Sequence, residues 1–332
     1  MKFVCSIVLC VLVSLFTGAA ANTGSWQELP VIPRVKGKTL ERFERDLRRS
    51  ELSGMRAKVF AKVGDSNTEM ASALYGFGCS EPRYGRYKNL KPVVARYKRV
   101  RLPNLQPMEG CQPWNSFTRR SAAVRSGSLS NWATSLVADL PVAGHGSAPM
   151  GCDPDETPIA CEIRISRPRF VLIMTGTNDV TFDTVFEVPP GTLGRTSLPE
   201  LVRAVRQLGS VPVLSTLPPN LVPASTPATV YPYNQLIARV AARTGTPLIN
   251  LWRALTRPKM HNSGMDSGGL HLGRHDELDS QILLPGPTTY LDSVDLRPAA
   301  LRYGSNQRNL VWLRTLERLD AVAGALKRRR GR

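Results

Sequence analysis

The stretch Lys58-Val-Phe-Ala-Lys-Val-Gly-Asp-Ser-Asn-Thr68 decides the architecture of this chain. Residues 59–63 are mostly apolar and lead into a glycine, which predicts a strand that passes directly into a turn. The residues after Ser66 are suited to open a helix. A strand followed by a helix is the repeating unit of α/β folds with a parallel sheet.

The same alternation continues downstream. Residues 170–174 form a continuous apolar run, as expected for a strand that is covered by helices on both faces. The further elements that we predict are a helix at 198–208, a strand at 211–216, a helix at 233–244, a strand at 247–251 and a long amphipathic helix at 309–326. This order predicts a parallel sheet with helices on both of its faces.

Some segments fit the alternation less well. Pro212 indicates an irregular start or an edge position for the strand at 211–216. Residues 81–113 are basic, aromatic and punctuated by proline, which predicts an irregular insertion. We expect a charged helix at 39–49 and another helix at 129–140.

The N-terminus has the pattern of a secretory signal peptide. Met1-Lys2-Phe3 is a short basic region, residues 4–16 are apolar, and small residues follow up to Asn22. The apolar run is short for a membrane span, so we expect cleavage near Ala21 rather than an uncleaved anchor. A signal peptide at 1–21 predicts a secreted or periplasmic protein, with no integral membrane span after its removal.

The length of the chain is compatible with one large domain or two ordinary ones, but its long proline-rich connections look like loops rather than domain linkers. The chain has 332 residues, of which 42% are hydrophobic, and this is enough to bury a sizeable core. We expect a polar N-terminal extension at 22–50, the folded domain at 51–326 and a solvated basic tail at 327–332.

Four cysteines remain after removal of the signal peptide. An even number in an oxidising compartment predicts disulfides. Three pairings are possible, and the two bridges that need the least threading of the chain are Cys152–Cys161 and Cys79–Cys111. The absence of a Cys-x-x-Cys motif and the presence of only four histidines argue against a zinc site, and we expect no cofactor.

The chain is strongly basic, with a formal net charge of +18. Outside the cell, this charge favours anionic partners such as envelope polymers, lipid headgroups or acidic substrates. No motif interleaves aromatic and basic residues as motifs that bind nucleobases do, so we expect no nucleic-acid partner.

Three short motifs contain residues that could take part in catalysis. Gly64-Asp65-Ser66 follows the first strand, Gly176-Thr-Asn-Asp179 follows the strand at 170–174, and Gly268-Gly-Leu-His271 lies nearer the C-terminus. Taken singly, the first is better explained as a helix N-cap turn and the second as an Asx turn, and an isolated histidine is most often incidental. Parallel strands bring their carboxyl ends to one edge of the sheet, so together the motifs predict a serine, an amide donor and a histidine in one crevice.

These three blocks resemble those of the SGNH, or GDSL-type, hydrolases. The resemblance extends to Leu214-Ser-Thr-Leu-Pro-Pro219, Pro247-Leu-Ile-Asn-Leu-Trp252 and Arg308-Asn-Leu-Val-Trp-Leu313, as in exported bacterial members, and covers roughly residues 55 to 325. It implies a flavodoxin-like, three-layer α/β/α fold with long loop insertions. It also implies ester hydrolysis or, less often, acyl transfer.

The resemblance assigns roles to individual residues. Ser66 resembles the nucleophile and His271 the general base. The oxyanion hole would comprise the Ser66 N–H, the Asn178 side chain and a glycine N–H. Gly127, which precedes the helix expected at 129–140, is the best match for that glycine, although an ordinary loop glycine is the alternative. Asp65 is expected to bond to the backbone around its turn.

The third block departs from the family pattern. The family's acid usually stands three residues before the histidine, and Gly268 occupies that position. Asp266 lies five residues before the histidine, and Asp276 is a weaker substitute. The sequence therefore predicts either a displaced triad with Asp266, or a Ser66–His271 dyad, or an impaired hydrolase.

The leading functional hypothesis is an exported serine esterase that hydrolyses acyl or acetyl esters. One alternative is an acyltransferase or deacetylase that acts on an envelope polysaccharide, which differs only in the acceptor or the substrate. Another is a non-catalytic envelope-binding protein on the same fold. The glycine at position 268, where the family usually has its acid, favours this last hypothesis. The presence of Ser66, Asn178 and His271 favours an enzyme.

Overall fold

The computed structural model describes residues 25–105, 112–222, 227–257, 259–274 and 292–331. The expected signal peptide at 1–21 lies outside these residues. In the described part of the chain, no helix combines the length and the apolar character that a membrane crossing requires.

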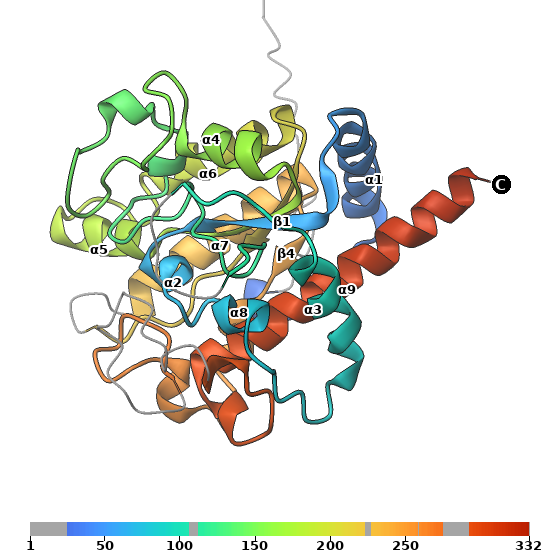
Figure 1. The fold of residues 1–332 in the computed structure, drawn as a ribbon. Coiled ribbons are helices and arrows are strands. Elements are labelled where there is room, and N and C mark those ends of the chain that lie inside the picture. Colours follow the sequence, from blue (N-terminus) through green and yellow to red (C-terminus); the bar gives the residue numbers. More distant parts are fainter. Residues whose placement is uncertain (1–24, 106–111, 223–226, 258, 275–291, 332) are drawn as a thin grey trace, which may run out of the picture.

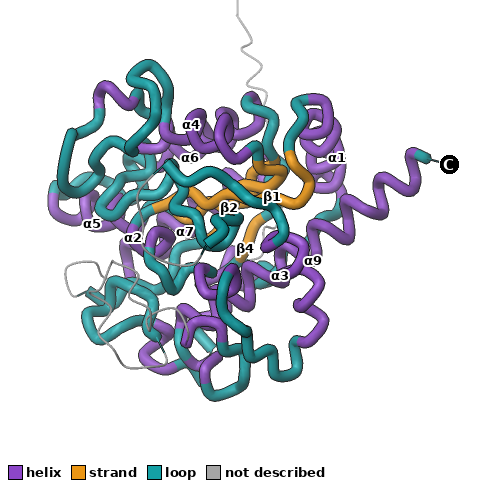
Figure 2. Tube along the Cα trace, in the orientation of Figure 1, coloured by secondary structure: helices purple, strands orange, loops and turns teal. Residues whose placement is uncertain are grey.

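A four-stranded parallel sheet forms the centre of the molecule (Figures 1 and 2). Its strands lie in the order β1 (Arg56–Gly64), β2 (Pro168–Met174), β3 (Val211–Ser215) and β4 (Leu248–Ile249). An isolated parallel bridge joins Gly64 to Val124. There the Gly64 N–H donates to the Ala123 carbonyl at 3.2 Å and the Arg125 N–H donates to the Gly64 carbonyl at 3.0 Å. With this segment counted beside β1, the strand order is that of flavodoxin-like folds.

Helices cover both faces of the sheet. They are α1 (Gly37–Leu52), α2 (Ser66–Glu69), α3 (Lys91–Lys98), α4 (Pro158–Ser166), α5 (Thr177–Val185), α6 (Gly194–Gln207), α7 (Pro227–Thr244), α8 (Leu251–Leu255) and α9 (Gly304–Arg330). Short 3-10 turns lie at Trp26–Glu28, Tyr75–Gly78, Lys88–Leu90, Trp132–Thr134, Val137–Asp139, His261–Gly264, Asp292–Val294 and Ala300–Arg302.

The side chains of β2 show why the fold has three layers. Phe170 and Leu172 point into a core shared with α1, α3, α8 and α9, whereas Val171 and Ile173 point into a second core shared with α4, α6 and α7. Successive side chains of a strand point to opposite faces, so an unbroken apolar run buries both. In Figure 1, α4 and α6 lie on one side of the sheet and α3 and α9 on the other. The predicted three-layer α/β/α architecture is confirmed.

The prediction of a helix at 129–140 is wrong. This segment holds only the two 3-10 turns at Trp132–Thr134 and Val137–Asp139. The hydroxyls of Thr134 and Ser135 donate to the Asn131 carbonyl, and the Trp132 indole N–H donates to the Gly146 carbonyl at 2.7 Å. Such local side-chain bonds and a distant partner replace the regular helical ladder.

The prediction of an irregular insertion at 81–113 is wrong for its central part, which forms α3. Val93, Val94 and Tyr97 are buried there, and the Tyr97 hydroxyl donates to Asp320 of α9 at 3.1 Å. The prolines and basic residues of this segment obscured an amphipathic pattern only two turns long.

Pro212 lies near the start of β3, as one alternative predicted, but β3 is not an edge strand, because it runs between β2 and β4. The Leu214 N–H donates to the Pro247 carbonyl, and backbone groups two residues apart in a strand face the same neighbour. β4 does not extend far enough to lie opposite Pro212. The missing N–H of the proline therefore removes no hydrogen bond to β4.

Residues of the expected N-terminal extension supply part of one helical layer. Phe43 of α1 stacks on Phe170 of β2 with ring centroids 6.1 Å apart, and Asp46 pairs with Arg206 at 2.8 Å. At the other end of the chain, α9 continues to Arg330, so residues 327–330 of the expected solvated tail are exposed but helical.

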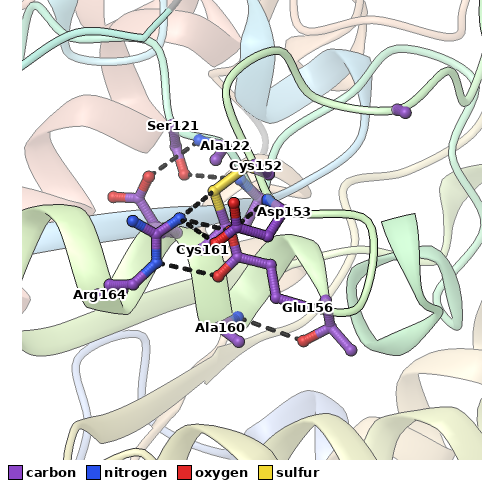
Figure 3. Close-up of a disulfide and its surroundings, with 12 residues drawn as sticks. Ser121, Ala122, Cys152, Asp153, Glu156, Ala160, Cys161 and Arg164 are labelled. Carbon is purple, nitrogen blue, oxygen red and sulfur yellow. Dashed lines mark hydrogen bonds and ion pairs between the residues drawn. A yellow bond between two sulfur atoms is a disulfide. The ribbon is translucent and has the colours of Figure 1, made fainter. Parts of the chain in front are cut away.

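The disulfide Cys152–Cys161 is confirmed and ties the preceding loop to α4. Figure 3 shows Arg164 beside it, with its guanidinium turned toward Glu156, to which the Arg164 Nε donates at 3.0 Å. Cys79 is also disulfide-bonded, but its expected partner Cys111 lies outside the described residues, so that pairing stays a prediction.

Candidate active site

The end of β1 places Ser66 at the sheet's carboxyl edge. A side chain at Gly64 would come within 2.0 Å of the Met174 carbonyl oxygen, so only glycine fits beside β2. Asp65 caps α2 by accepting the Asn67 N–H at 3.1 Å. Ser66, the first residue of α2, has an exposed fraction of 8%. The turn therefore works as a helix cap and also holds the serine hydroxyl at a fixed position.

Asp65 joins the first motif to the second. Its Oδ2 accepts the Thr177 N–H at 3.2 Å, across from the Asn67 N–H at Oδ1. The expectation that this carboxylate bonds to backbone is confirmed. Burial raises the pKa of Asp65 to about 6, and the two N–H donors offset only part of this rise.

We expect this carboxyl to make stability fall as the pH rises. Between its ordinary value of 3.8 and about 6, the folded state keeps the proton that the unfolded state has lost, so stability falls with pH in this window. The difference corresponds to about 3 kcal/mol of unfolding free energy. Urea denaturation of wild type and Asp65→Asn, at pH values between 4 and 7 spaced by roughly 0.5, measures this change in unfolding free energy. The wild-type curve should fall relative to the variant's, and parallel curves would contradict the assignment.

His271 faces Ser66. The distance from His271 Nε2 to Ser66 Oγ is 3.1 Å, which is within hydrogen-bond range. Asn67 holds the histidine's backbone on both sides, because its Nδ2 donates to the Leu270 carbonyl and its Oδ1 accepts the Leu272 N–H, each at 3.1 Å. Buried Arg308 in turn donates to the Asn67 carbonyl at 2.6 Å. Sequence reasoning missed the parts played by Asn67 and Arg308.

Asp266 is the carboxylate beside His271. Its Oδ2 lies 3.6 Å from His271 Nδ1, and its Oδ1 accepts the His271 backbone N–H at 3.3 Å. The Asp266 N–H donates to the His271 carbonyl at 2.8 Å, in a hairpin closed by the Met265–Leu272 bridge. Paired backbone strands thus bring a residue five positions upstream to the imidazole. A direct carboxylate–imidazole hydrogen bond requires this separation to shorten by several tenths of an ångström.

The other candidates for the acid and the base lie elsewhere or outside the described residues. Gly268 has no side chain to offer, and both Asp276 and His275 lie outside the described residues. His261 stacks on Tyr303 with ring centroids 5.2 Å apart.

Asn178 is hydrogen-bonded to the segment that follows Gly127. The Asn178 Nδ2 donates to the Ser128 carbonyl at 2.8 Å, which leaves its second amide hydrogen for another acceptor. Within the described chain, neither the Ser66 N–H nor the Gly127 N–H has a hydrogen-bond acceptor. Gly127 has φ of 73°, and a side chain there would come within 2.6 Å of His145. Within the described residues, one N–H group therefore stays free at each of Ser66, Gly127 and Asn178, and position 127 requires glycine.

A carboxylate on α2 anchors Ser126, the residue before Gly127. Glu69 pairs with Arg120 and accepts both the Ser126 N–H and the Ser126 hydroxyl at 2.5 Å. The Ser126 carbonyl accepts the Gly146 N–H at 3.0 Å. This carbonyl and the Gly127 N–H belong to one planar peptide and point in opposite directions, so fixing one fixes the other. Nothing in the sequence pattern pointed to Glu69.

We expect Glu69→Gln to lower kcat for ester hydrolysis by roughly tenfold to 100-fold, with KM little changed. The amide keeps the shape of the side chain but loses the charge that holds Arg120 and Ser126. Steady-state kinetics measure the effect beside Glu156→Gln, a control that removes an Arg-paired carboxylate whose partner is Arg164 rather than Arg120 or Ser126. Equal kinetic losses in both variants, or a change in melting temperature alone, would contradict this role.

Comparison with known proteins identifies the family. The family model of the GDSL-like lipase/acylhydrolase family matches residues 63–275. The chain belongs to this family. The matched region begins at the end of β1 and includes Ser66, Gly127, Asn178, Asp266 and His271. Membership makes this GDSL-like protein a hydrolase that acts on ester bonds. None of the curated proteins matches it.

Proposed function

We propose that the protein is an exported serine esterase with Ser66 as nucleophile, His271 as general base and Asp266 as the group that orients the histidine. The contact of 3.1 Å between His271 Nε2 and Ser66 Oγ carries the proposal. A serine becomes nucleophilic at neutral pH only when a positioned base takes its proton. The Asp266 carboxylate on the Nδ1 side favours the tautomer that leaves Nε2 free to do so.

The reaction follows from these positions. Ser66 Oγ attacks the ester carbonyl carbon while its proton passes to His271 Nε2. The oxyanion takes hydrogen bonds from the Ser66 N–H, the Gly127 N–H and the free amide hydrogen of Asn178. The tetrahedral intermediate then collapses, and its bond to the alcohol oxygen breaks. The alcohol leaves with the proton from His271 Nε2. Water then attacks the acyl-enzyme by the same route and releases the carboxylic acid and Ser66.

Export is supported by the N-terminal pattern and by disulfide-bonded cysteines, which persist in oxidising compartments. In such a setting the charge of +18 favours anionic surroundings. Transfer of the acyl group to a polysaccharide hydroxyl instead of water requires the same residues and a bound acceptor. Hydrolysis is the simpler proposal, because it needs no acceptor site.

Covalent labelling tests the assignment directly. A fluorophosphonate probe should label Ser66, as read by peptide mass spectrometry, and the protein should turn over p-nitrophenyl acetate. His271→Ala should abolish both, whereas His261→Ala, which removes a histidine stacked on Tyr303, should preserve both. Labelling at a different residue, or undiminished turnover in His271→Ala, would contradict the proposal.

A further inference from the structure

A groove of about 930 Å³ lies apart from the candidate active site, between the loop at 86–87, the end of α8 and the segment that leads into α9. Its volume is typical of sites that hold a small molecule. None of its lining residues belongs to the set that surrounds Ser66. The reaction proposed above therefore leaves this groove unexplained.

The exposed part of the groove's lining is cationic. Four of the lining residues, which we call the cationic rim, carry a positive charge: Arg86, Arg257, Lys259 and Arg302. All four are exposed. Among the residues that the structure describes, no acidic residue lines the groove and none of the four is ion-paired. Arg86 donates to the Tyr87 hydroxyl and Arg302 to the Lys259 carbonyl, which are neutral acceptors. Nearby Arg297, by contrast, is neutralised by Asp295 at 2.7 Å.

The bottom of the groove is apolar. The residues that we call the apolar floor are Ala254, Leu296, Met260 and Leu301. The first two are buried and the last two half-buried. Water over such a surface is readily displaced by hydrocarbon. An anionic sugar polymer could pair with the cationic rim, but its hydroxyl groups would lie against the apolar floor, which offers them no hydrogen bonds.

We propose that this groove binds one anionic phospholipid at a membrane surface, with the headgroup phosphate on the cationic rim and hydrocarbon on the apolar floor. Charge complementarity selects an anion, and the floor selects an amphiphile over a soluble polyanion. The occupied groove docks the protein on anionic membranes. This proposal stands independently of the residues that cleave the ester.

Vesicle binding by the full chain tests it. Co-sedimentation with vesicles of phosphatidylcholine and phosphatidylglycerol in equal parts, at physiological salt, compares wild type with the triple variant Arg86→Gln, Arg257→Gln, Arg302→Gln. The control is Lys327→Gln, Arg328→Gln, Arg329→Gln, which removes the same charge from the exposed end of α9. We expect the groove variant to bind roughly 100-fold more weakly and the control less than about threefold more weakly. Leu301→Asp, which places a charge on the floor, should weaken binding without removing a cation.

The outcomes separate the possibilities. Equal losses in the two triple variants would reduce the effect to net charge and overturn the proposal. Undiminished binding by Leu301→Asp would do the same, because the floor would then be irrelevant. Soluble polygalacturonate that binds wild type but not the groove variant, while vesicle binding stays equal, would identify a polysaccharide site instead. Unchanged p-nitrophenyl acetate turnover in every variant checks the fold.

Discussion

Ser66→Ala is expected to lower kcat/KM for p-nitrophenyl acetate by roughly 10⁴-fold or more. The substitution removes the only atom that bonds covalently to the substrate in the proposed mechanism, and it leaves the oxyanion donors in place. The residual rate comes from those donors and from substrate binding. Steady-state hydrolysis of the purified protein measures it, with the uncatalysed rate subtracted.

The matched control is Ser210→Ala. Ser210 is also buried, and its hydroxyl donates to the Pro168 carbonyl at 2.7 Å beside the opposite end of β2. Its loss should lower the melting temperature slightly and leave turnover intact. Equal turnover by wild type and Ser66→Ala would overturn the serine esterase proposal, whatever the control does.

Asp266→Asn is expected to lower kcat by roughly 10² to 10⁴-fold with a small effect on KM. Asparagine has the same shape, and its oxygen still accepts the His271 backbone N–H that Oδ1 holds at 3.3 Å. What disappears is the negative charge beside Nδ1, which stabilises the imidazolium formed when Ser66 is deprotonated. The melting temperature should change little, so a catalytic loss would not reflect unfolding.

The comparison variant is Asp276→Asn, because Asp276 is the first carboxyl residue after the histidine in the sequence. If Asp266→Asn retains full turnover, the displaced triad fails and a Ser66–His271 dyad remains. If only Asp276→Asn loses turnover, the acid has been assigned to the wrong residue. Loss in Asp266→Asn alone is the expected pattern.

Much of the fold follows from local sequence pattern. The apolar runs of β1 and β2, and the amphipathic spacing of α6 and α9, require no distant partner to be recognised. The motifs at Ser66, Asn178 and His271 were also readable, because two of them directly follow strands and a parallel sheet gathers such ends at one edge.

The predictions that failed depend on long-range contacts. The helix expected at 129–140 gives way where Trp132 reaches Gly146 and the Ser130 N–H donates to Asp179 at 2.9 Å. The segment at 81–113 becomes helical at α3 because Val93, Val94 and Tyr97 pack into a core that includes residues of β1 and α9. A local window contains none of these partners.

Local sequence patterns were enough to predict the α/β class, the parallel sheet, a serine and an amide after strands, and a histidine in a later loop, since periodicity and turn motifs are local properties. The groups that support these residues became visible only in the folded chain. Arg308 reaches Asn67 across 241 positions, and Asn67 reaches the backbone of Leu270 across 203. Asp266 meets His271 because a backbone hairpin, rather than the family's usual spacing, sets their distance. Such contacts depend on how the chain packs in space, and no spacing rule along the sequence encodes them.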